Sequence, residues 1–232
     1  MTTLETVVVT ARRGVRIVQF GPLRISYDQR VLEPRPWTAL QSRWANQLIG
    51  TAAPGPVLEL CSGAGQIGLL AVHGTDRRLV AVDANPVASA FHRINARAAG
   101  LEDQVEVRTS YLTDACAEDE LFPMILADPP WVLRSQVDRF PDDPVRAIDG
   151  GEDGLDVARQ CIDVINRHLD DDGVALVQVG DGPQVQQLAD ALPYGLVATE
   201  HRAEPGRGAV VKVVATEPRQ RRLTGRGSGA RG

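Results

Sequence analysis

The stretch of sequence that decides the fold is VLELCSGAGQIG, which occupies residues 57–68. Its first four residues are apolar except for Glu59 and predict a short buried strand, after which a glycine-rich turn leads into a helix. Gly63 and Gly65 let the backbone turn tightly and let a cofactor approach the main chain closely. Asp83 ends the next predicted strand, where its carboxylate can accept hydrogen bonds from both hydroxyls of a ribose. The stretch therefore predicts a Rossmann-like α/β fold that binds a nucleoside-containing cofactor.

The glycine pattern alone fits two kinds of cofactor. Gly63, Gly65 and Gly68 match a dinucleotide fingerprint as well as the loop of an S-adenosylmethionine site. Glu59 favours the second, because a carboxylate at the end of the first strand would repel a pyrophosphate but can meet the cationic methionine end of S-adenosylmethionine, directly or through water. S-adenosylmethionine is therefore the predicted cofactor. The alternatives are a ligand-free turn for the loop and capping of the following helix for Asp83.

Short apolar strands alternate with helical stretches after residue 56, which is typical of a parallel sheet with helices on both faces. Two late strands are joined without a helix and predict a hairpin at the sheet edge, so the sheet is expected to be mostly parallel and seven-stranded. A small β-hairpin region and an amphipathic helix with Leu40, Trp44, Leu48 and Ile49 on one face are predicted ahead of it. The predicted strands are 7–9, 16–20, 23–26, 57–60, 79–82, 105–107, 124–127, 174–179, 196–201 and 209–215, and the predicted helices are 37–49, 66–73, 86–99, 155–169 and 184–192.

A second run, FPMILADPPW at residues 122–131, predicts a buried strand that ends in an acid, two prolines and an aromatic residue. In a doubly wound sheet the carboxyl end of this strand lies beside the cofactor cleft. Methylation of an amino or amide nitrogen needs acceptors that hold its N–H groups, and the Asp128 side chain and the Pro129 carbonyl can supply them. Pro130 belongs to the same turn, and Trp131 offers a flat face for a planar amide or a base. The run indicates a nitrogen-methylating site, with a proline-stiffened surface turn as the alternative.

The composition limits the partners. The chain has 232 residues and a net charge of −5, and five of its arginines lie in the last sixteen residues, so the remainder is distinctly acidic. An acidic body disfavours a substrate held along a phosphate backbone and favours a protein or a small molecule as methyl acceptor. We expect a cytoplasmic protein without a membrane partner, because no apolar run approaches the length of a bilayer span and no secretory signal is recognisable.

The remaining polar residues suggest no further chemistry. The three cysteines and four histidines have no metal-ligand spacing, so no metal site is predicted, and the histidines are expected on helix surfaces or in packing positions. The acidic runs 118–120 and 170–172 are expected to be solvated turns.

Together the motifs resemble class I S-adenosylmethionine-dependent methyltransferases with an (Asp/Asn)-Pro-Pro-(Tyr/Trp/Phe) motif. They are more closely similar to the HemK-type family, which methylates the glutamine side-chain nitrogen of peptide release factors. Residues 34–38, PRPWT, are similar to the stretch ahead of that family's catalytic fold, and residues 143–156, DPVRAIDGGEDGLD, to the segment after its catalytic motif. The resemblance covers roughly residues 15–216. This chain has Asp128 and Trp131 where that family has asparagine and tyrosine.

The resemblance implies a role for each matching position. It places the substrate nitrogen at residues 128–131, the methionine and adenosine of the cofactor along the glycine loop, the ribose at Asp83, and the adenine beside Tyr111 or Leu112. The implied cofactor-binding residues are Glu59, Cys61, Ser62, Gly63, Gly65, Asp83, Ala84, Tyr111, Leu112 and Asp128, and the implied catalytic residues are Asp128, Pro129, Pro130 and Trp131.

The sequence thus predicts a β-hairpin and helix extension over residues 1–50, a cofactor-binding catalytic domain over 51–216, and a disordered arginine- and glycine-rich tail over 217–232. The leading hypothesis is methyl transfer to a nitrogen, most simply a protein glutamine amide or a related amide or amine. A nucleic-acid N-methyltransferase acting on an adenine-type amino group is the main alternative, because Asp-Pro-Pro-Trp also occurs in such enzymes. A nicotinamide-dependent oxidoreductase and a non-catalytic cofactor-binding protein are further alternatives.

Overall fold

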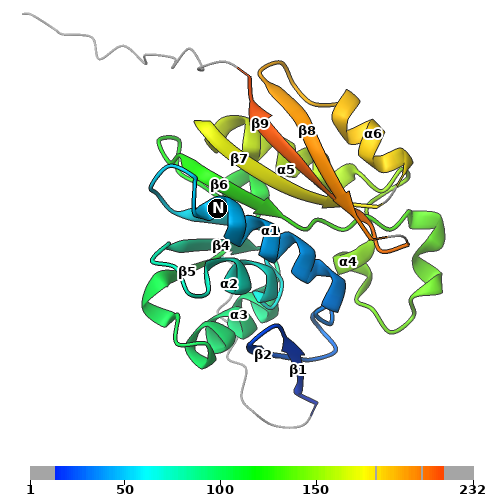
Figure 1. The fold of residues 1–232 in the computed structure, drawn as a ribbon. Helices are drawn as coiled ribbons and strands as arrows, with labels where there is room; N and C mark the ends of the chain where they lie inside the picture. The colour runs from blue at the N-terminus through cyan, green and yellow to red at the C-terminus, as the bar shows by residue number, and fades with distance from the viewer. Residues whose placement is uncertain (1–13, 181, 205, 217–232) are drawn as a thin grey trace, which may run out of the picture.

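The computed structural model describes residues 14–216 with the exception of 181 and 205 (Figure 1). The strand predicted at 7–9 and the tail predicted at 217–232 lie outside the described residues. No helix in the described ranges is long and apolar enough to cross a lipid bilayer. The described chain forms one seven-stranded mixed sheet with helices on both faces, together with a separate two-stranded hairpin.

The strands of the central sheet lie in the order β5-β4-β3-β6-β7-β9-β8. The first five run parallel to their neighbours, whereas β9 pairs antiparallel with both β7 and β8. The predicted sheet and its edge hairpin are therefore confirmed. The strands are β3 (Val57–Leu60), β4 (Leu79–Asp83), β5 (Val105–Thr109), β6 (Phe122–Ala127), β7 (Leu169–Val179), β8 (Leu196–Ala203) and β9 (Ala209–Ala215).

The order of the strands reverses at β3, because β4 and β5 lie on one side of it and β6 and β7 on the other. In an open parallel sheet, the loops at the carboxyl ends of the strands separate at such a point and leave a crevice for a ligand. The carboxyl ends of β3, β4 and β6 carry Glu59, Asp83 and Asp128. The topology thus brings the three predicted site segments together at the carboxyl edge of the sheet, where such a crevice is expected.

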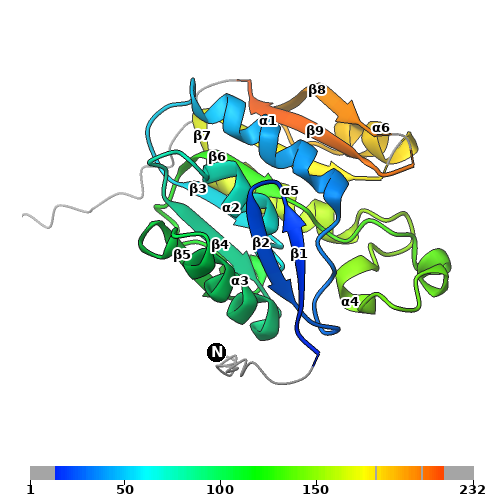
Figure 2. The same cartoon turned by 60° about the horizontal axis from the view of Figure 1, so that its bottom comes forward.

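Two hydrophobic cores fill the two faces of the sheet. On one face, α1, α2 and α3 pack together with the hairpin formed by β1 and β2 (Figure 2), and Trp44 and Phe91 are among its buried side chains. On the other face, α5 and α6 contribute Ile162 and Leu188. The elements are β1 (Arg16–Phe20), β2 (Leu23–Tyr27), α1 (Ala39–Ile49), α2 (Gln66–Val72), α3 (Pro86–Ala98), α5 (Asp156–His168) and α6 (Pro183–Asp190).

Some local predictions are wrong. The acids 170–172 belong to β7 and not to a turn. They lie where the pairing with β6 is irregular, between the pairs Phe122–Leu169 and Met124–Val174, so they remain at least partly exposed within the strand. The buried face of α1 also contains Gln41 and Ser42, whereas Leu40 and Leu48 are only partly buried. Short helices that the sequence did not predict are η1 (Pro36–Thr38), η2 (Glu102–Gln104), η3 (Leu112–Asp114), η4 (Arg134–Arg139) and α4 (Val145–Ile148).

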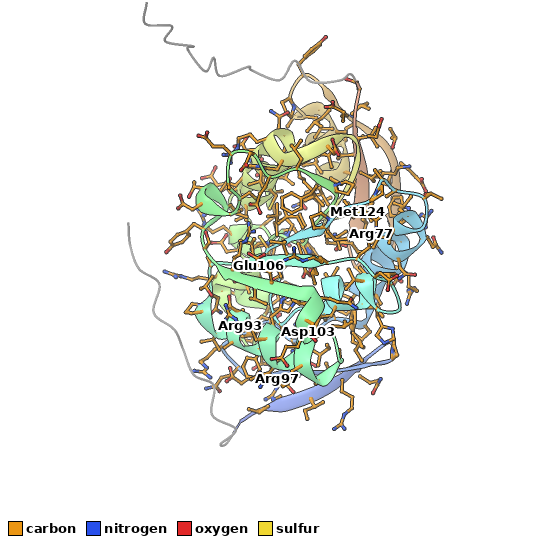
Figure 3. The ribbon with its side chains drawn as sticks, turned by 90° about the vertical axis from the view of Figure 1, so that its left-hand side faces the viewer. Arg77, Arg93, Arg97, Asp103, Glu106 and Met124 are labelled. Atoms are coloured by element: carbon orange, nitrogen blue, oxygen red, sulfur yellow. The ribbon has the colours of Figure 1, made fainter. Side chains whose placement is uncertain are left out.

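The β5 edge of the sheet is protected by charged side chains. Arg93 of α3 donates to the backbone carbonyl of Val107 at 2.7 Å and so occupies an acceptor that another strand could use. Figure 3 views this side and shows Glu106 on β5, with Arg93, Arg97 and Asp103 around the strand and α3. Charged side chains at an exposed edge discourage pairing with another sheet.

Candidate functional site

The loop after β3 is held in a conformation that leaves room beside its backbone. Cys61 lies in the left-handed region at φ 58°, a strained conformation for a residue with a side chain. Gly65 has φ 89° immediately before α2, and a Cβ on it would lie 2.5 Å from the ring of His92. A Cβ on Gly63 would meet open space, with its nearest neighbour 4.0 Å away. The packing therefore requires glycine at Gly65, and the loop presents open backbone at Gly63.

Glu59 lies under the first turn of α2. Its Oε1 accepts a hydrogen bond from the Gly68 amide at 2.8 Å, and its buried Oε2 has no hydrogen-bond partner among the described residues. Burial raises the pKa of Glu59 to about 8, with smaller contributions from the charges of Asp128 and Asp83, and the hydrogen bond from Gly68 acts in the opposite direction. One oxygen of this buried carboxyl group is therefore left without a partner among the described residues.

Asp83 joins the glycine loop to the end of β4. Its Oδ2 accepts a hydrogen bond from the Gly63 amide at 2.7 Å, and its Oδ1 accepts one from the Asn85 amide at 2.8 Å. The cap of α3 is Asn85, whose side chain accepts from the Val87 amide, so the capping role considered for Asp83 belongs to its neighbour. Burial raises the pKa of Asp83. A carboxylate oxygen has more than one acceptor position, so a ribose hydroxyl can still be bound here.

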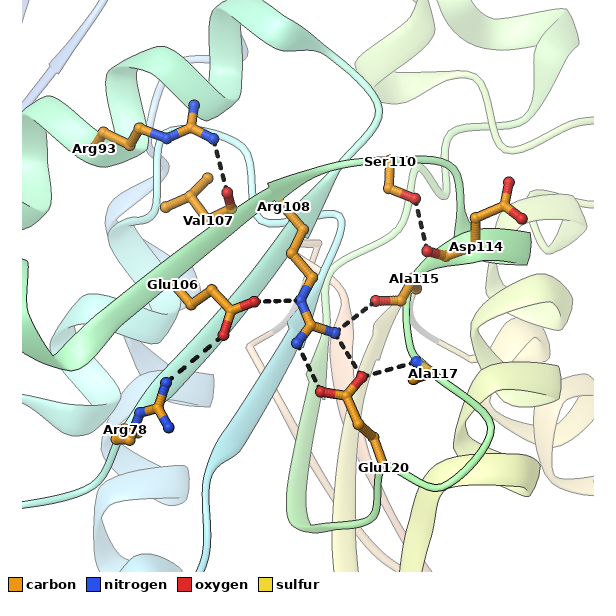
Figure 4. A network of polar contacts seen from close by, with 10 residues as sticks. All are labelled: Arg78, Arg93, Glu106, Val107, Arg108, Ser110, Asp114, Ala115, Ala117 and Glu120. Carbon is orange, nitrogen blue, oxygen red and sulfur yellow. Dashed lines mark hydrogen bonds and ion pairs between the residues drawn. The ribbon is translucent and has the colours of Figure 1, made fainter. Parts of the chain in front are cut away.

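A network of charges positions the loop that carries the predicted adenine contacts (Figure 4). Arg108 donates to both carboxylate oxygens of Glu120 at 2.7 Å and to the Ala115 carbonyl at 3.0 Å. Arg108 also lowers the pKa of Glu120 to about 2. Residues 118 and 119 form an exposed turn as predicted, whereas Glu120 is partly buried. The Ser110 amide donates to the Asp83 carbonyl. Tyr111 and Leu112 therefore follow a residue that is bound to Asp83 and precede Ala115, which is bound to Arg108.

The Asp128-Pro129-Pro130-Trp131 segment, called here the acceptor loop, follows β6. The Asp128 amide donates to the Leu60 carbonyl at 3.4 Å, which places the loop beside the end of β3. Among the residues that the structure describes, no donor reaches the Asp128 carboxylate or the Pro129 carbonyl. Although part of its surface stays accessible, burial of the Asp128 side chain raises its pKa to about 7. Two acceptors are thus free at the carboxyl end of β6.

Two buried glutamines hold the ends of the acceptor loop. The Gln41 side chain on α1 donates to the carbonyl of Ala127, the residue before Asp128, at 3.0 Å and to the Leu176 carbonyl at 2.9 Å. Gln184 on α6 donates to the carbonyl of Trp131 at 3.0 Å. Neither residue is among the site residues predicted from the sequence. A polar residue on the buried face of a predicted helix, as at Gln41, is the signal that could have identified one of them.

The two further stretches of the family resemblance support the same loop. Val132 forms a parallel bridge with Asp149, and the Gly150 amide donates to the Val132 carbonyl at 2.9 Å. Arg35 of the PRPWT stretch donates to both carboxylate oxygens of Asp143 at 2.6 Å. The segment 143–156 is therefore held beside Val132, which follows the acceptor loop, and is also joined to Arg35.

Several predicted cofactor residues have other contacts. The Ser62 side chain is buried and lies 3.3 Å from the Nδ1 of His92, so it faces inward. The Cys61 Sγ lies 3.9 Å from the Cys161 Sγ on α5, and this contact together with burial raises the pKa of the Cys61 thiol. His92 is a packing residue as predicted, and burial lowers its pKa to about 3. Ala84 is exposed beside Asp83.

The crevice suits a cofactor that carries positive charge. Glu59, Asp83 and Asp128 converge on it, and no arginine or lysine in the described ranges forms an ion pair with any of them. Uncompensated buried carboxylates are unfavourable, so they favour a cationic ligand. S-adenosylmethionine carries a sulfonium and an ammonium group at the end that the glycine loop would hold. The residues present therefore fit this cofactor.

Known proteins show what this chain resembles. The family model described as Methyltransferase small domain matches residues 45–179. The release factor glutamine methyltransferase of Clostridium acetobutylicum is 27% identical over an alignment that covers 82% of this chain and 69% of the relative. The ribosomal protein uL3 glutamine methyltransferase of Francisella tularensis subsp. tularensis is 30% identical, with 75% of this chain and 58% of the relative covered. The chain thus spans only part of the length of these curated relatives.

A solved structure supports the fold. The catalytic domain of hMettl16, determined in complex with MAT2A 3'UTR hairpin 6, matches with a TM-score of 0.65 over 83% of this chain and 75% of that chain. Its sequence identity is 14%, so the likeness concerns the fold alone. The Rossmann-like methyltransferase fold predicted from the sequence is confirmed.

Proposed function

Because this chain belongs to the methyltransferase small domain family and is an S-adenosylmethionine-dependent methyltransferase, we propose that its methyl acceptor is the side-chain amide nitrogen of a protein glutamine. The observation that carries the proposal is the pair of free acceptors at Asp128 and Pro129. The named activities of the two relatives, on release factors and on ribosomal protein uL3, support a protein glutamine as acceptor.

The cofactor would lie across the carboxyl ends of β3 and β4. In this proposal Glu59 and the backbone at Gly63 face its methionine end, Asp83 holds its ribose, and Tyr111 or Leu112 lies beside its adenine. Bound S-adenosylmethionine supplies an electrophilic methyl group. The Gly63 amide is already held by Asp83, so the loop and the ribose acceptor form one prearranged unit.

The acceptor loop would orient the nitrogen. A primary amide has two N–H groups, and the Asp128 carboxylate and the Pro129 carbonyl can each accept one. Two acceptors at fixed positions restrict rotation of the amide and direct its nitrogen toward the crevice. Ionised Asp128 can only accept hydrogen bonds, whereas its protonated form would donate one to the substrate and lose this match. The chemistry of the loop therefore suits a neutral amide in a partly buried site.

An adenine-type amino group is the second candidate, and the carboxylate of Asp128 in place of an amide is the feature that favours it. Charge opposes it. The region that follows the acceptor loop, residues 131–156, contains seven acids and three arginines, and these arginines include Arg134, which pairs with Asp149. A polyanionic substrate would meet a net negative surface.

The test is methyl transfer from labelled S-adenosylmethionine to a cell extract, followed by protease or nuclease digestion of the product. The proposal predicts label in protein, and mass spectrometry should find it as one methyl group on a glutamine side chain. Label that nuclease releases, with none on glutamine, would replace the proposal with the nucleic-acid alternative. Heat-treated protein serves as the control for non-enzymatic methylation.

A further inference from the structure

A groove of about 410 Å³ opens beside the acceptor loop, on the side away from the glycine loop. One wall is apolar and comes from Trp131, Leu133 and Phe140, and the other comes from the start of α6 with Pro183 and Gln187. Trp131 belongs both to this wall and to the acceptor loop. The groove is therefore continuous with the site proposed for the methylated nitrogen.

Buried hydrogen bonds fix the shape of the groove. Gln184 lies at its base and is almost fully buried. Its side chain accepts from the Gly180 amide at 2.6 Å and donates to the carbonyls of Trp131 and Asp153 at 3.0 and 2.9 Å. A Cβ on Gly154 would lie 2.0 Å from the Gln184 Nε2, so Gly154 packs too closely against Gln184 to be replaced by a residue with a side chain. Both walls are fixed to one amide group.

The side chains that line the groove carry almost no net charge. Among the described residues that line it, Asp153 is the ionisable one, and Arg159 forms an ion pair with that carboxylate. The side-chain amides of Gln136 and Gln187 line the groove and have no hydrogen-bond partner among the described residues. Free amides can pair with a peptide backbone, and the apolar wall can take an uncharged side chain. In the described part of the chain no arginine or lysine lines the groove, so a phosphate backbone would find no counter-charge in its lining.

We propose that this groove binds the polypeptide of the methyl acceptor next to its methylated residue, with an apolar side chain against Leu133 and Phe140. The inference rests on the proposed protein-glutamine activity and deepens it, because it assigns part of the acceptor's sequence preference to a place outside the acceptor loop. Phe140 is 43% exposed, so it has apolar surface left to cover. The acidic surroundings of residues 131–156 further favour a neutral or basic polypeptide.

The probe is a set of short fluorescein-labelled peptides with a central glutamine, in which one neighbour at a time is leucine, phenylalanine, glycine or aspartate. Binding is measured by fluorescence anisotropy in the presence of S-adenosylhomocysteine, and methylation is measured separately with S-adenosylmethionine. We expect leucine or phenylalanine in one flanking position to tighten binding about tenfold over glycine, and aspartate to weaken it. An RNA oligonucleotide should not compete.

Two variants locate the preference in the groove. Phe140→Ala should raise the Kd and the KM of the apolar-flanked peptide by about five- to tenfold, with kcat and S-adenosylhomocysteine affinity unchanged and little effect on the glycine-flanked peptide. Gln187→Ala should weaken all the peptides by a similar, smaller factor. Tyr194→Ala is the matched control, because Tyr194 is 91% exposed and does not line the groove. Melting temperatures verify that each variant folds.

The possible results of these experiments distinguish failure of the proposed peptide groove from failure of the proposed glutamine methylation. Equal peptide binding by Phe140→Ala and Tyr194→Ala, or competition by the RNA, would contradict peptide binding in the groove. Glutamine peptides that are methylated without any flanking preference would also overturn it while leaving the function intact. If no glutamine peptide is methylated but binding still depends on Phe140, the glutamine assignment fails and the groove stands.

Discussion

At the scale of the residue, the decisive property of the site is the ionisation of Asp128. Burial raises the pKa of this carboxyl to about 7, from an ordinary value of 3.8, and no donor among the described residues lowers it again. Near neutral pH the side chain therefore changes between an acceptor and a donor of hydrogen bonds. The proposed orientation of a substrate N–H needs the ionised form.

A pH profile tests this requirement. We expect kcat/KM, which reports on the free enzyme, to rise as pH increases through about 7 and then to level off, because the acceptor form of Asp128 accumulates. Asp128→Asn keeps an acceptor oxygen at every pH, so it should retain substantial activity on a neutral amide and lose this rise. A variant as inactive as alanine would show that the negative charge itself is needed, as for a substrate that becomes cationic.

A second prediction at this scale concerns the role of Asp83 in cofactor binding. Asp83→Ala removes the acceptor of the Gly63 and Asn85 amides as well as the proposed ribose acceptor. S-adenosylmethionine binding should weaken by about 1–3 kcal/mol, measured by calorimetry. An unchanged dissociation constant in a folded variant would remove Asp83 from the cofactor site.

At the scale of the element, the strands and helices of the sheet follow from the alternation of apolar runs, and the structure confirms nearly all of them. The chemistry-bearing residues Glu59, Asp83 and Asp128 could be predicted because each lies at a strand end, where topology alone determines the neighbourhood. Gln41 could be noticed only as a polar residue on a buried helix face. The roles of Gln41 and Gln184 could not be predicted, because they depend on which carbonyls lie opposite after α1 and α6 have packed. Local patterns do not contain that information.

The Gln184 contacts lead to a prediction about α6. Gln184→Leu removes two donated hydrogen bonds and one accepted hydrogen bond in a buried position, so unfolding should become easier by about 3 kcal/mol. Turnover should fall more than S-adenosylhomocysteine affinity, since the Trp131 carbonyl is released while the glycine loop is untouched. Gln186→Leu on the exposed side of the same helix is the control. Equal effects of the two changes on stability and turnover would contradict this role.

At the scale of the whole molecule, the carboxyl groups that prepare the crevice for a cation should also affect stability. Glu59 has an ordinary pKa of 4.5 and a folded value of about 8, so the folded protein holds a proton that the unfolded chain has released. The stabilisation from this proton is complete below pH 4.5 and is lost as pH rises toward 8.

The melting temperature of the ligand-free protein should therefore fall between pH 5 and pH 8. Glu59→Gln should reduce that fall, because the neutral amide keeps an acceptor for Gly68 and has no charge to bury. Added S-adenosylmethionine should protect the native protein more than the variant. An identical pH dependence of melting in both proteins would show that Glu59 does not titrate in this range.

The central claim is that Asp128 in the acceptor loop acts mainly on the substrate nitrogen, whereas Glu59, Asp83 and the glycine loop provide most of the cofactor binding. The most direct measurement is kcat and the Kd of S-adenosylhomocysteine for Asp128→Ala beside the native protein, with the acceptor identified from extract. We predict that kcat falls about 100-fold or more, because one of two acceptors that direct the amide is lost, while the Kd changes only modestly. Full activity in Asp128→Ala would contradict the claim, and so would a loss of cofactor binding that accounts for the whole loss of activity.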